Sequence, residues 1–414
     1  MMQPSRIHLF QAFGVELEYM VVDRDTLQVK PITDELLKHE LGSYGSDYEN
    51  GMVTWSNELV LHVIELKSTR PEYNFNALEN AFAENIKRIN AILSGWNAML
   101  MPTAAHPFMN PMTETKLWPH DNNDVYTIYN KIFDCRGHGW SNLQSTHLNL
   151  PFYDDEEFAK LHAAIRLVLP ILPALCASSP LLDGKLTGIQ DTRLRYYKTN
   201  QIRIPSITGK VIPEAVFSKR NYYNVVYEKI KNDIAPYDIE QVLDPIWVNS
   251  RGAIPRFDRG SIEIRVMDIQ ECPAADMAII TLVIETIKAL AGGKFIGVED
   301  QMKWKTETLV SILDLVIENG QHAIIHQPDY IKLFGSAEQT SSANALWQFI
   351  MNRLIRSGNS SLEKWKPELD IILKQGTLAQ RIINAVGTEP THQQIITVYK
   401  HLCDCLAQNR MFIH

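Results

Sequence analysis

The stretch FGVELEYMVV, residues 13–22, decides the fold class, because its apolar and charged side chains alternate at its centre. Apolar side chains occupy the odd positions, whereas Glu16 and Glu18 occupy even ones. A β-strand has a side-chain period of two, so both carboxylates lie on one face, about 7 Å apart. Two acids inside a sheet cost free energy unless positive charge lies between them, and a divalent metal would supply it. The alternative is a strand with one solvated face, which is common in antiparallel sheets.

The composition is that of an ordinary globular protein with room for a large core. The chain has 414 residues, of which 45% are hydrophobic and 21% are charged, and its formal net charge is −8. This charge provides no global basic field, so neither nucleic acid nor an anionic membrane is expected as a main partner. Five cysteines, an odd and low number for this length, favour reduced thiols over a disulfide framework. We find no signal peptide or convincing membrane span in the sequence, and therefore expect a cytoplasmic protein.

Three further stretches repeat the division between an apolar face and a face of ligand-type side chains: residues 54–68 with Glu58 and Glu65, residues 144–151 with His147 and Asn149, and residues 260–268 with Glu263 and Arg265. Solvated strand faces usually carry Thr, Lys, Ser and Gln, so four such stretches favour a metal site over four solvated faces. Carboxylate and carboxamide oxygens with one imidazole suit Mg²⁺ or Mn²⁺ better than Zn²⁺. The sequence therefore predicts a sheet lined with ligands for a hard divalent cation.

Alternatives stay open for several of these residues. Glu58 and Glu65 are seven positions apart, so one continuous strand would send them to opposite faces unless a bulge intervenes. Glu263 and Arg265 are also compatible with an ion pair on a solvated face, and His147 with a hydrogen-bonded core histidine.

The remaining sequence predicts helices around the strands. Apolar spacing predicts amphipathic or buried helices over residues 74–95 and 274–292, and helical patterns continue from 300 to 414. Residues 104–134 are rich in Pro, Asn, His and Asp, which indicates a long surface excursion or a lid. Strands together with segregated helices indicate an α+β protein.

The charged face suits phosphoryl chemistry, because metals bridge phosphates and arginines bind their oxygens. The chain has no Walker A sequence, no kinase signature and no Rossmann glycine fingerprint. A nucleotide would therefore be held by metals on the sheet rather than by a glycine-rich loop at the start of a helix.

Five blocks run in order through the first two thirds of the chain and carry a family resemblance: FGVELEYMVVD at 13–23, VIELKSTRP at 63–71, STHLNLPF at 145–152, SSPLLDGKLTGIQDTRLRYY at 178–197 and PRFDRGSIEIRVMDIQECP at 255–273. Together they resemble the bacterial glutamate–cysteine ligase and carboxylate–amine ligase family, which has the glutamine-synthetase-like fold. The resemblance implies a curved antiparallel sheet of about six strands backed by helices. It implies one catalytic domain over residues 1–414, with a sheet-containing core at 1–299 and a helical layer at 300–414.

The resemblance also implies roles for the charged residues. The concave face of the sheet would hold ATP and two or three Mg²⁺ (or Mn²⁺) ions. The implied metal ligands are Glu16, Glu18, Glu65, His147 and Glu263. Arg265 would act at the transferring phosphoryl group, with Glu58 as a second catalytic group. Arg193 would contact the carboxylate substrate, and Asn149, where many relatives carry a second histidine, is assigned to substrate binding.

The activity implied is ATP-dependent amide formation. The γ-phosphoryl group of ATP would pass to a carboxylate, with the γ-carboxylate of glutamate as the expected acid, and an amine such as cysteine would displace phosphate from the acyl phosphate. The expected partners are therefore small molecules: an amino acid, an amine and ATP. Two alternatives are phosphoryl transfer to a guanidino group and a family member that binds ligands without turnover. A homo-oligomer is left open.

Overall fold

The computed structural model describes residues 6–121 and 123–413, and β1 (Gly14–Asp23) lies inside its main sheet. The sheet is open and antiparallel, with the order β2-β3-β4-β1-β6-β10-β9 and with β5 also paired to β1. Its other strands are β2 (Asp47–Asn50), β3 (Val53–Asn57), β4 (Val63–Ser68), β5 (Ala98–Met101), β6 (Ser145–Pro151), β9 (Ala253–Arg256) and β10 (Ser261–Asp268). The expected mixture of helices and antiparallel sheet is confirmed.

The sheet has eight strands in the described part of the chain, so the expected number of about six was too low. One reason is that residues 54–68 form a hairpin rather than one strand, with Ser56 opposite Glu65. Its turn contains no Gly or Pro. The turn is held instead by a distant segment, through hydrogen bonds from Leu61 N to Lys116 O and from Trp118 N to Leu59 O, both of 2.9 Å. Local sequence therefore carried no turn signal.

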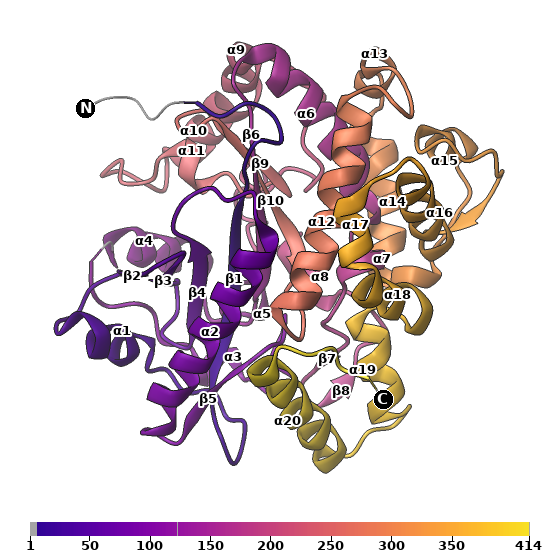
Figure 1. Cartoon of the computed structure of the whole chain (residues 1–414). Helices are drawn as coiled ribbons and strands as arrows, with labels where there is room; N and C mark the ends of the chain where they lie inside the picture. Colours follow the sequence, from indigo (N-terminus) through magenta and orange to yellow (C-terminus); the bar gives the residue numbers. More distant parts are fainter. Residues whose placement is uncertain (1–5, 122, 414) are drawn as a thin grey trace.

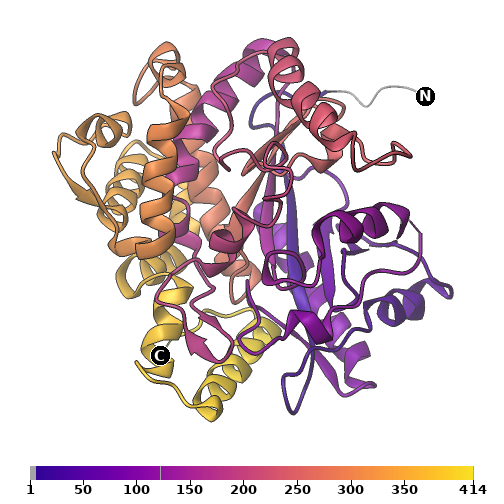
Figure 2. The same ribbon diagram turned by 180° about the vertical axis from the view of Figure 1, so that it is seen from behind.

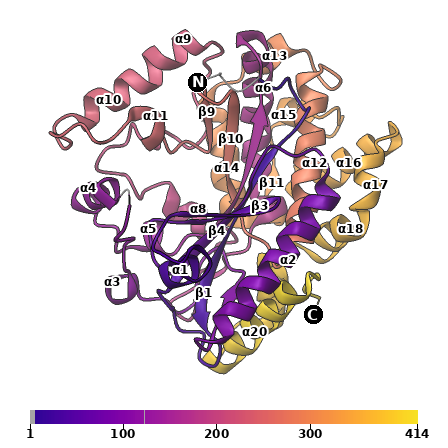
Figure 3. The ribbon, with the colours of Figure 1, turned by 60° about the vertical axis from the view of Figure 1, so that its left-hand side comes forward.

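Helices cover the apolar face of the sheet (Figure 3). The odd-numbered apolar residues of β1 are buried in one core with α2 (Phe75–Ser94) and α12 (Pro273–Ala291). Helix α2 begins at Asn74, whose side chain accepts a hydrogen bond from Ala77 N, and its buried stripe includes Phe82 and Ile86. Burying each such side chain contributes roughly 1.5–3 kcal/mol. Both helices were predicted from the sequence.

The C-terminal segment is predominantly helical, as expected; most of it lies beyond α12, and its last helix packs against β5 (Figures 1 and 2). Its helices are α13 (Val298–Met302), α14 (Thr306–Asn319), α15 (Pro328–Leu333), α16 (Ala343–Arg356), α17 (Ser360–Lys364), α18 (Lys366–Gln375), α19 (Leu378–Val386) and α20 (His392–Gln408), with a 3-10 turn at Gly320–His322 and the short pair β11 (Ile324–Ile325) and β12 (Ser341–Ser342). Tyr330 and Trp347 anchor the segment by donating hydrogen bonds to the carbonyls of Leu167 and Ile171, at 2.6 and 2.8 Å.

The opposite, polar face of the sheet looks toward a second group of short helices (Figure 3). These are α4 (Asn123–Phe133), α5 (His138–Ser141), α8 (Thr192–Tyr197) and α11 (Pro245–Val248). Residues 104–134, interpreted from the sequence as a long surface excursion or a lid, contain α3 (Pro111–Glu114) as well as α4. The face between the sheet and these helices is where the charged residues lie.

The remaining elements connect these layers. They are α1 (Thr33–Leu41), α6 (Asp155–Val168), α7 (Pro173–Cys176), α9 (Lys219–Tyr222), α10 (Glu228–Ile234), β7 (Leu181–Leu182), β8 (Lys185–Leu186), a 3-10 turn at Leu169–Ile171 and a π-helical turn at Tyr223–Tyr227. None of the described helices combines the length and the apolar character needed to cross a bilayer.

Candidate active site

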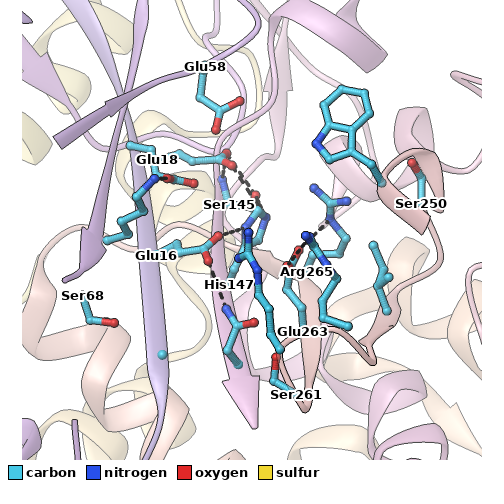
Figure 4. A pocket seen from close by; sticks show the side chains of 18 of the residues that line it. Glu16, Glu18, Glu58, Ser68, Ser145, His147, Ser250, Ser261, Glu263 and Arg265 are labelled. Atoms are coloured by element: carbon cyan, nitrogen blue, oxygen red, sulfur yellow. Dashed lines mark hydrogen bonds and ion pairs between the residues drawn. The ribbon is translucent and has the colours of Figure 1, made fainter. Parts of the chain in front are cut away.

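Antiparallel register arranges the polar side chains in rows that cross the sheet. The first row runs through Asp47, Ser56, Glu65 and Glu18 on β2, β3, β4 and β1. The second row runs through Lys67, Glu16 and His147 on β4, β1 and β6, and the third pairs Asn149 with Glu263. Directly paired residues point to the same side of a sheet, so groups far apart in sequence meet on one face (Figure 4).

This face forms the floor of a cavity of about 860 Å³, a size suited to small-molecule ligands. Helices α4, α5, α8 and α11 supply much of the opposite wall, including the aromatic side chains of Tyr126, Tyr129, Trp140 and Trp247. Every described residue that lines the cavity belongs to the first 265 positions. The C-terminal helical segment thus supports the sheet from the other side.

His147 connects the two acids of β1. Its Nδ1 atom lies 2.8 Å from Glu16 Oε2, and its Nε2 atom lies 2.9 Å from Ser145 Oγ and 3.6 Å from Glu18 Oε1. Burial acts to lower the pKa of His147, but hydrogen bonding to Glu16 and the charges of both glutamates outweigh it and raise that pKa. Asn149 donates a 3.0 Å hydrogen bond from Nδ2 to Glu16 Oε1. In this structure, Asn149 therefore orients an acid.

Carboxylates within the cluster have opposite pKa shifts. Burial raises the pKa of Glu16, but the hydrogen bond and positive charge of His147, followed by Arg265 and Lys67, reduce it to about 2. Burial and the charge of Glu18 raise the pKa of Glu58 to about 7. Burial and the charges of Glu16 and Glu58 also raise the pKa of Glu65 well above its ordinary value. On the Glu58–Glu65 side of the cavity, burial and neighbouring carboxylates therefore outweigh the positive charge of Lys67, whose Nζ lies 3.5 Å from Glu65 Oε1.

The donors fit a divalent cation. Two groups of ligand atoms, Glu16–His147–Glu263 and Glu18–Glu65–His147, each lie within 4.8 Å of one another. These two groups bring together all five residues expected to bind metal. Their carboxylate oxygens and single imidazole match the preference of Mg²⁺ or Mn²⁺.

Glu58 reaches the same cavity as Glu65, although the two are an odd number of positions apart. Glu58 immediately follows β3, at the start of the hairpin turn, and its Oε2 accepts a 3.3 Å hydrogen bond from Leu59 N. The hairpin reverses the chain between the two glutamates, so they do not lie on one strand. An odd separation in sequence therefore does not place them on opposite faces. The single-strand interpretation of residues 54–68 was wrong, whereas the convergence of the two acids is observed.

A β-bulge in β10 brings Asp268 to the polar face of the sheet. The pairing with β6 shifts between Ile264 and Met267, so Asp268 lies opposite Ser145 instead of one position beyond it. Without this shift, Asp268 would face the apolar side. Before the bulge, Arg265 Nε lies 3.6 Å from Glu263 Oε1, and Arg256 Nη1 on β9 lies 3.9 Å from Glu263 Oε2.

Asp268 fixes the guanidinium of Arg193 at the cavity. Both residues are almost fully buried, and Arg193 Nε donates a hydrogen bond to Asp268 Oδ1. Asp268 Oδ2 accepts hydrogen bonds of 2.8 Å from both Ser178 N and Ser179 Oγ. Arg193 also lines the cavity, and its Nη2 atom has no hydrogen-bond partner among the described residues. A buried donor without a partner is costly, and a carboxylate ligand would satisfy it.

Several site residues were not predicted from the sequence. They are Lys67, Asp268, Arg256 and the aromatic residues of the cavity wall. A usable signal existed for Lys67, because it lies two positions after Glu65 and therefore on the same strand face. Arg256 stands within the block at 255–273. Asp268 depended on the bulge, and the aromatic residues come from segments that are remote in sequence.

Comparison with known proteins finds a family match over most of the chain. The family model for glutamate–cysteine ligase family 2 matches residues 12–399. A protein of Archaeoglobus fulgidus that carries no functional name is 28% identical over 403 residues, which are 97% of this chain and 100% of that protein. A Bradyrhizobium sp. (strain ORS 278) protein named "Putative glutamate--cysteine ligase 2" is 27% identical over 274 residues, which are 65% of this chain and 59% of that protein.

Two solved structures share the fold at low sequence identity. A bifunctional glutathione synthetase from Pasteurella multocida has a TM-score of 0.61 and 14% identity, with 97% of this chain and 53% of that chain covered. A glutamate–cysteine ligase from Francisella tularensis, solved in complex with AMP, has a TM-score of 0.60 and 11% identity, with 96% and 88% covered. The family match over nearly the whole chain is the finding that decides membership. The chain belongs to glutamate–cysteine ligase family 2, and its enzyme class is that of the ATP-dependent carboxylate–amine ligases.

Proposed function

We propose that this protein joins the γ-carboxylate of glutamate, or a closely similar acid, to an amine such as cysteine through an acyl phosphate formed from ATP. One observation carries the proposal. Five buried or half-buried metal-type ligands from four strands converge on the floor of one cavity, with Arg193, Arg256 and Arg265 around them. This combination suits the binding of a polyphosphate beside a carboxylate.

The positions of the arginines indicate two binding regions in the cavity, one for phosphoryl groups and one for a carboxylate. Arg265 and Arg256 lie at Glu263, so they are placed to bind phosphoryl oxygens on that side. Arg193 is held by Asp268 and has an unpartnered Nη2, which makes it the group assigned to the carboxylate substrate. Glu16, Glu18, Glu65, His147 and Glu263 would hold Mg²⁺, which would supply positive charge to neutralise the charge that develops during transfer.

Glu58 is assigned to the amine. It lines the cavity but belongs to neither group of candidate metal ligands, so its carboxylate remains available as a proton acceptor. An amine must lose a proton as it forms an amide, and a carboxylate within reach can accept that proton. Tyr126 lies nearby, because its hydroxyl accepts a 3.3 Å hydrogen bond from Asn57 Nδ2. In this scheme, Asn149 orients Glu16 rather than contacting substrate.

We further propose that residues 1–414 act as one catalytic unit with a glutamine-synthetase-like arrangement. Residues 300–414 would stabilise the sheet through α12 and α2 without contacting substrate. Support comes from the anchoring of the C-terminal segment on Leu167 and Ile171, and from its absence among the described residues that line the cavity.

An ADP-release screen tests the function. Purified protein would be supplied with ATP, Mg²⁺, one amino acid and one amine, and each component would be omitted in turn. We expect ADP and phosphate release that requires both the acid and the amine. A stable phosphorylated product formed without an amine would instead support phosphoryl transfer to a guanidino group. Failure to bind any nucleotide in the presence of Mg²⁺ would refute the proposal.

A further inference from the structure

Lys67 places a positive charge directly on the acid-lined face of the sheet. It follows Glu65 by two positions on β4, and it pairs across the sheet with Glu16 on β1. Lys67 also lines the cavity. Its position lies between two acids that belong to different groups of candidate metal ligands.

The ammonium group is held in place from two sides. Lys67 Nζ lies 3.0 Å from Asp47 Oδ1 and 3.5 Å from Glu65 Oε1. Asp47 in turn accepts a hydrogen bond from Ser56 Oγ on β3. Asp47, Ser56 and Glu65 occupy one row of the sheet, so three neighbouring strands determine where this ammonium lies. The Lys67 side chain is 34% exposed, so its ammonium group can contact ligands that enter the cavity from solvent.

This arrangement affects how many cations the site can accept. The described ligands form two groups of three, and both groups use His147. A further divalent ion on the β4 side would need Glu65 together with Asp47, but the Lys67 ammonium already lies between these carboxylates. Like charges at such a separation repel, so the ammonium excludes a metal there and weakens metal binding beside it.

We propose that Lys67 serves as a fixed cation of the site, and that its ammonium group weakens the binding of a divalent ion by Glu65 when the protein binds its nucleotide. The inference rests on the proposed function, because it assumes that the acid cluster binds a metal–nucleotide complex. Lys67 would also provide positive charge near the phosphates that does not depend on metal concentration.

The test measures metal binding rather than turnover. Mn²⁺ would be titrated into the full-length protein in the presence of a non-hydrolysable ATP analogue, with free Mn²⁺ followed by electron paramagnetic resonance. We expect the wild type to bind Mn²⁺ together with the nucleotide analogue. In Lys67→Met the repulsion is lost, so the apparent dissociation constant for Mn²⁺ should fall about tenfold, or more ions should bind per chain than in the wild type. Lys67→Arg keeps the charge and should resemble the wild type.

Matched controls identify the source of each result. Lys303→Met removes an exposed lysine whose ion pair among the described residues is with Asp300 on α13, and it should leave Mn²⁺ binding unchanged. Circular dichroism would confirm that each variant is folded, and Lys67→Gln would replace the methionine variant if that protein failed to fold. Equal Mn²⁺ binding by the wild type and Lys67→Met, in both affinity and number of ions, would overturn the role of Lys67. A wild type that binds no Mn²⁺ with the nucleotide analogue would instead refute the proposed function.

Discussion

The two faces of the central sheet use the same strands for opposite purposes. On β10, Ile264 is fully buried in the helix-covered core, whereas the adjacent Glu263 points into the cavity with Arg265 and Arg256 beside it. On β1, Leu17 is completely buried between Glu16 and Glu18, which both serve the candidate site. The apolar face is covered by packed side chains. The polar face retains buried polar groups that lack a full set of hydrogen-bond partners.

This difference shows how the fold tolerates a costly site. Buried like charges destabilise a protein, and the raised pKa values of Glu58 and Glu65 reflect that cost. The apolar residues between the acids offset it by anchoring each strand to α2 and α12. Changes on the polar face should therefore alter chemistry with little loss of stability, and changes on the apolar face should do the reverse.

The largest expected effect comes from the polar face. Glu263→Gln keeps the shape of the side chain but removes the charge that faces Arg265 and belongs to one group of candidate metal ligands. We expect the kcat for ADP release to fall about 10³-fold, because electrostatic stabilisation of the transferring group is lost. The thermal midpoint should change by no more than a few degrees. Activity within tenfold of the wild type would contradict the assignment of Glu263.

The neighbouring residue provides the matched change on the apolar face. Ile264→Ala should reduce the free energy of unfolding by about 2–5 kcal/mol, because it leaves a cavity in a fully buried core. Denaturant unfolding would measure the loss. Turnover per folded molecule should stay within about twofold of the wild type. A catalytic defect as large as that of Glu263→Gln would show that the two faces are not separable.

Asp268→Asn tests a positioning residue that the bulge brings to the polar side. The substitution weakens the charged hydrogen bond to Arg193 but keeps the side-chain shape. We expect the KM for the carboxylate substrate to rise about 10- to 100-fold, because hydrogen bonds between charged groups are worth about 1.5–3 kcal/mol. The KM for ATP should remain unchanged. An equal increase in both KM values would indicate a general structural role for Asp268.

The smallest effect concerns a histidine behind the apolar face. His162 is fully buried on α6, its ring stacked on that of Phe158, and burial followed by the charge of Arg166 lowers its pKa to about 3. The unfolded chain takes up a proton below about pH 6.5, and the folded chain does not. His162 therefore stabilises the fold above about pH 6.5, and this stability is lost as the pH falls toward 3, by about 1.4 kcal/mol per pH unit.

Unfolding midpoints measured between pH 7 and pH 4 would show this dependence. His162→Phe retains an aromatic ring without a titratable group, and its stability should fall less steeply with decreasing pH than that of the wild type. His62 and His106 also have pKa values lowered to about 4 by burial, so part of the slope should remain. Identical slopes for wild type and variant would contradict the assignment to His162.

Residues of the candidate site were predictable where side chains alternate between the two faces of a single strand. Glu16 and Glu18 follow from a period of two within one strand, and His147 and Asn149 follow in the same way. Asp268 could not be found by this argument, because the bulge changes the face on which it lies. The position of Glu58 was ambiguous for a similar reason: the hairpin turn is stabilised by residues 116–118 rather than by local turn chemistry.

The sequence by itself determined which side chains share a face, where the main helices form and, through its ordered blocks, the family to which the chain belongs. These properties depend on neighbouring residues and on backbone geometry, which a short segment encodes. Only the tertiary structure decided that Lys67, Glu16 and His147 form one row, and that Asp268 holds Arg193 beside the cavity. Strand register and the bulge set these distances, and both result from packing between segments that are far apart in the chain.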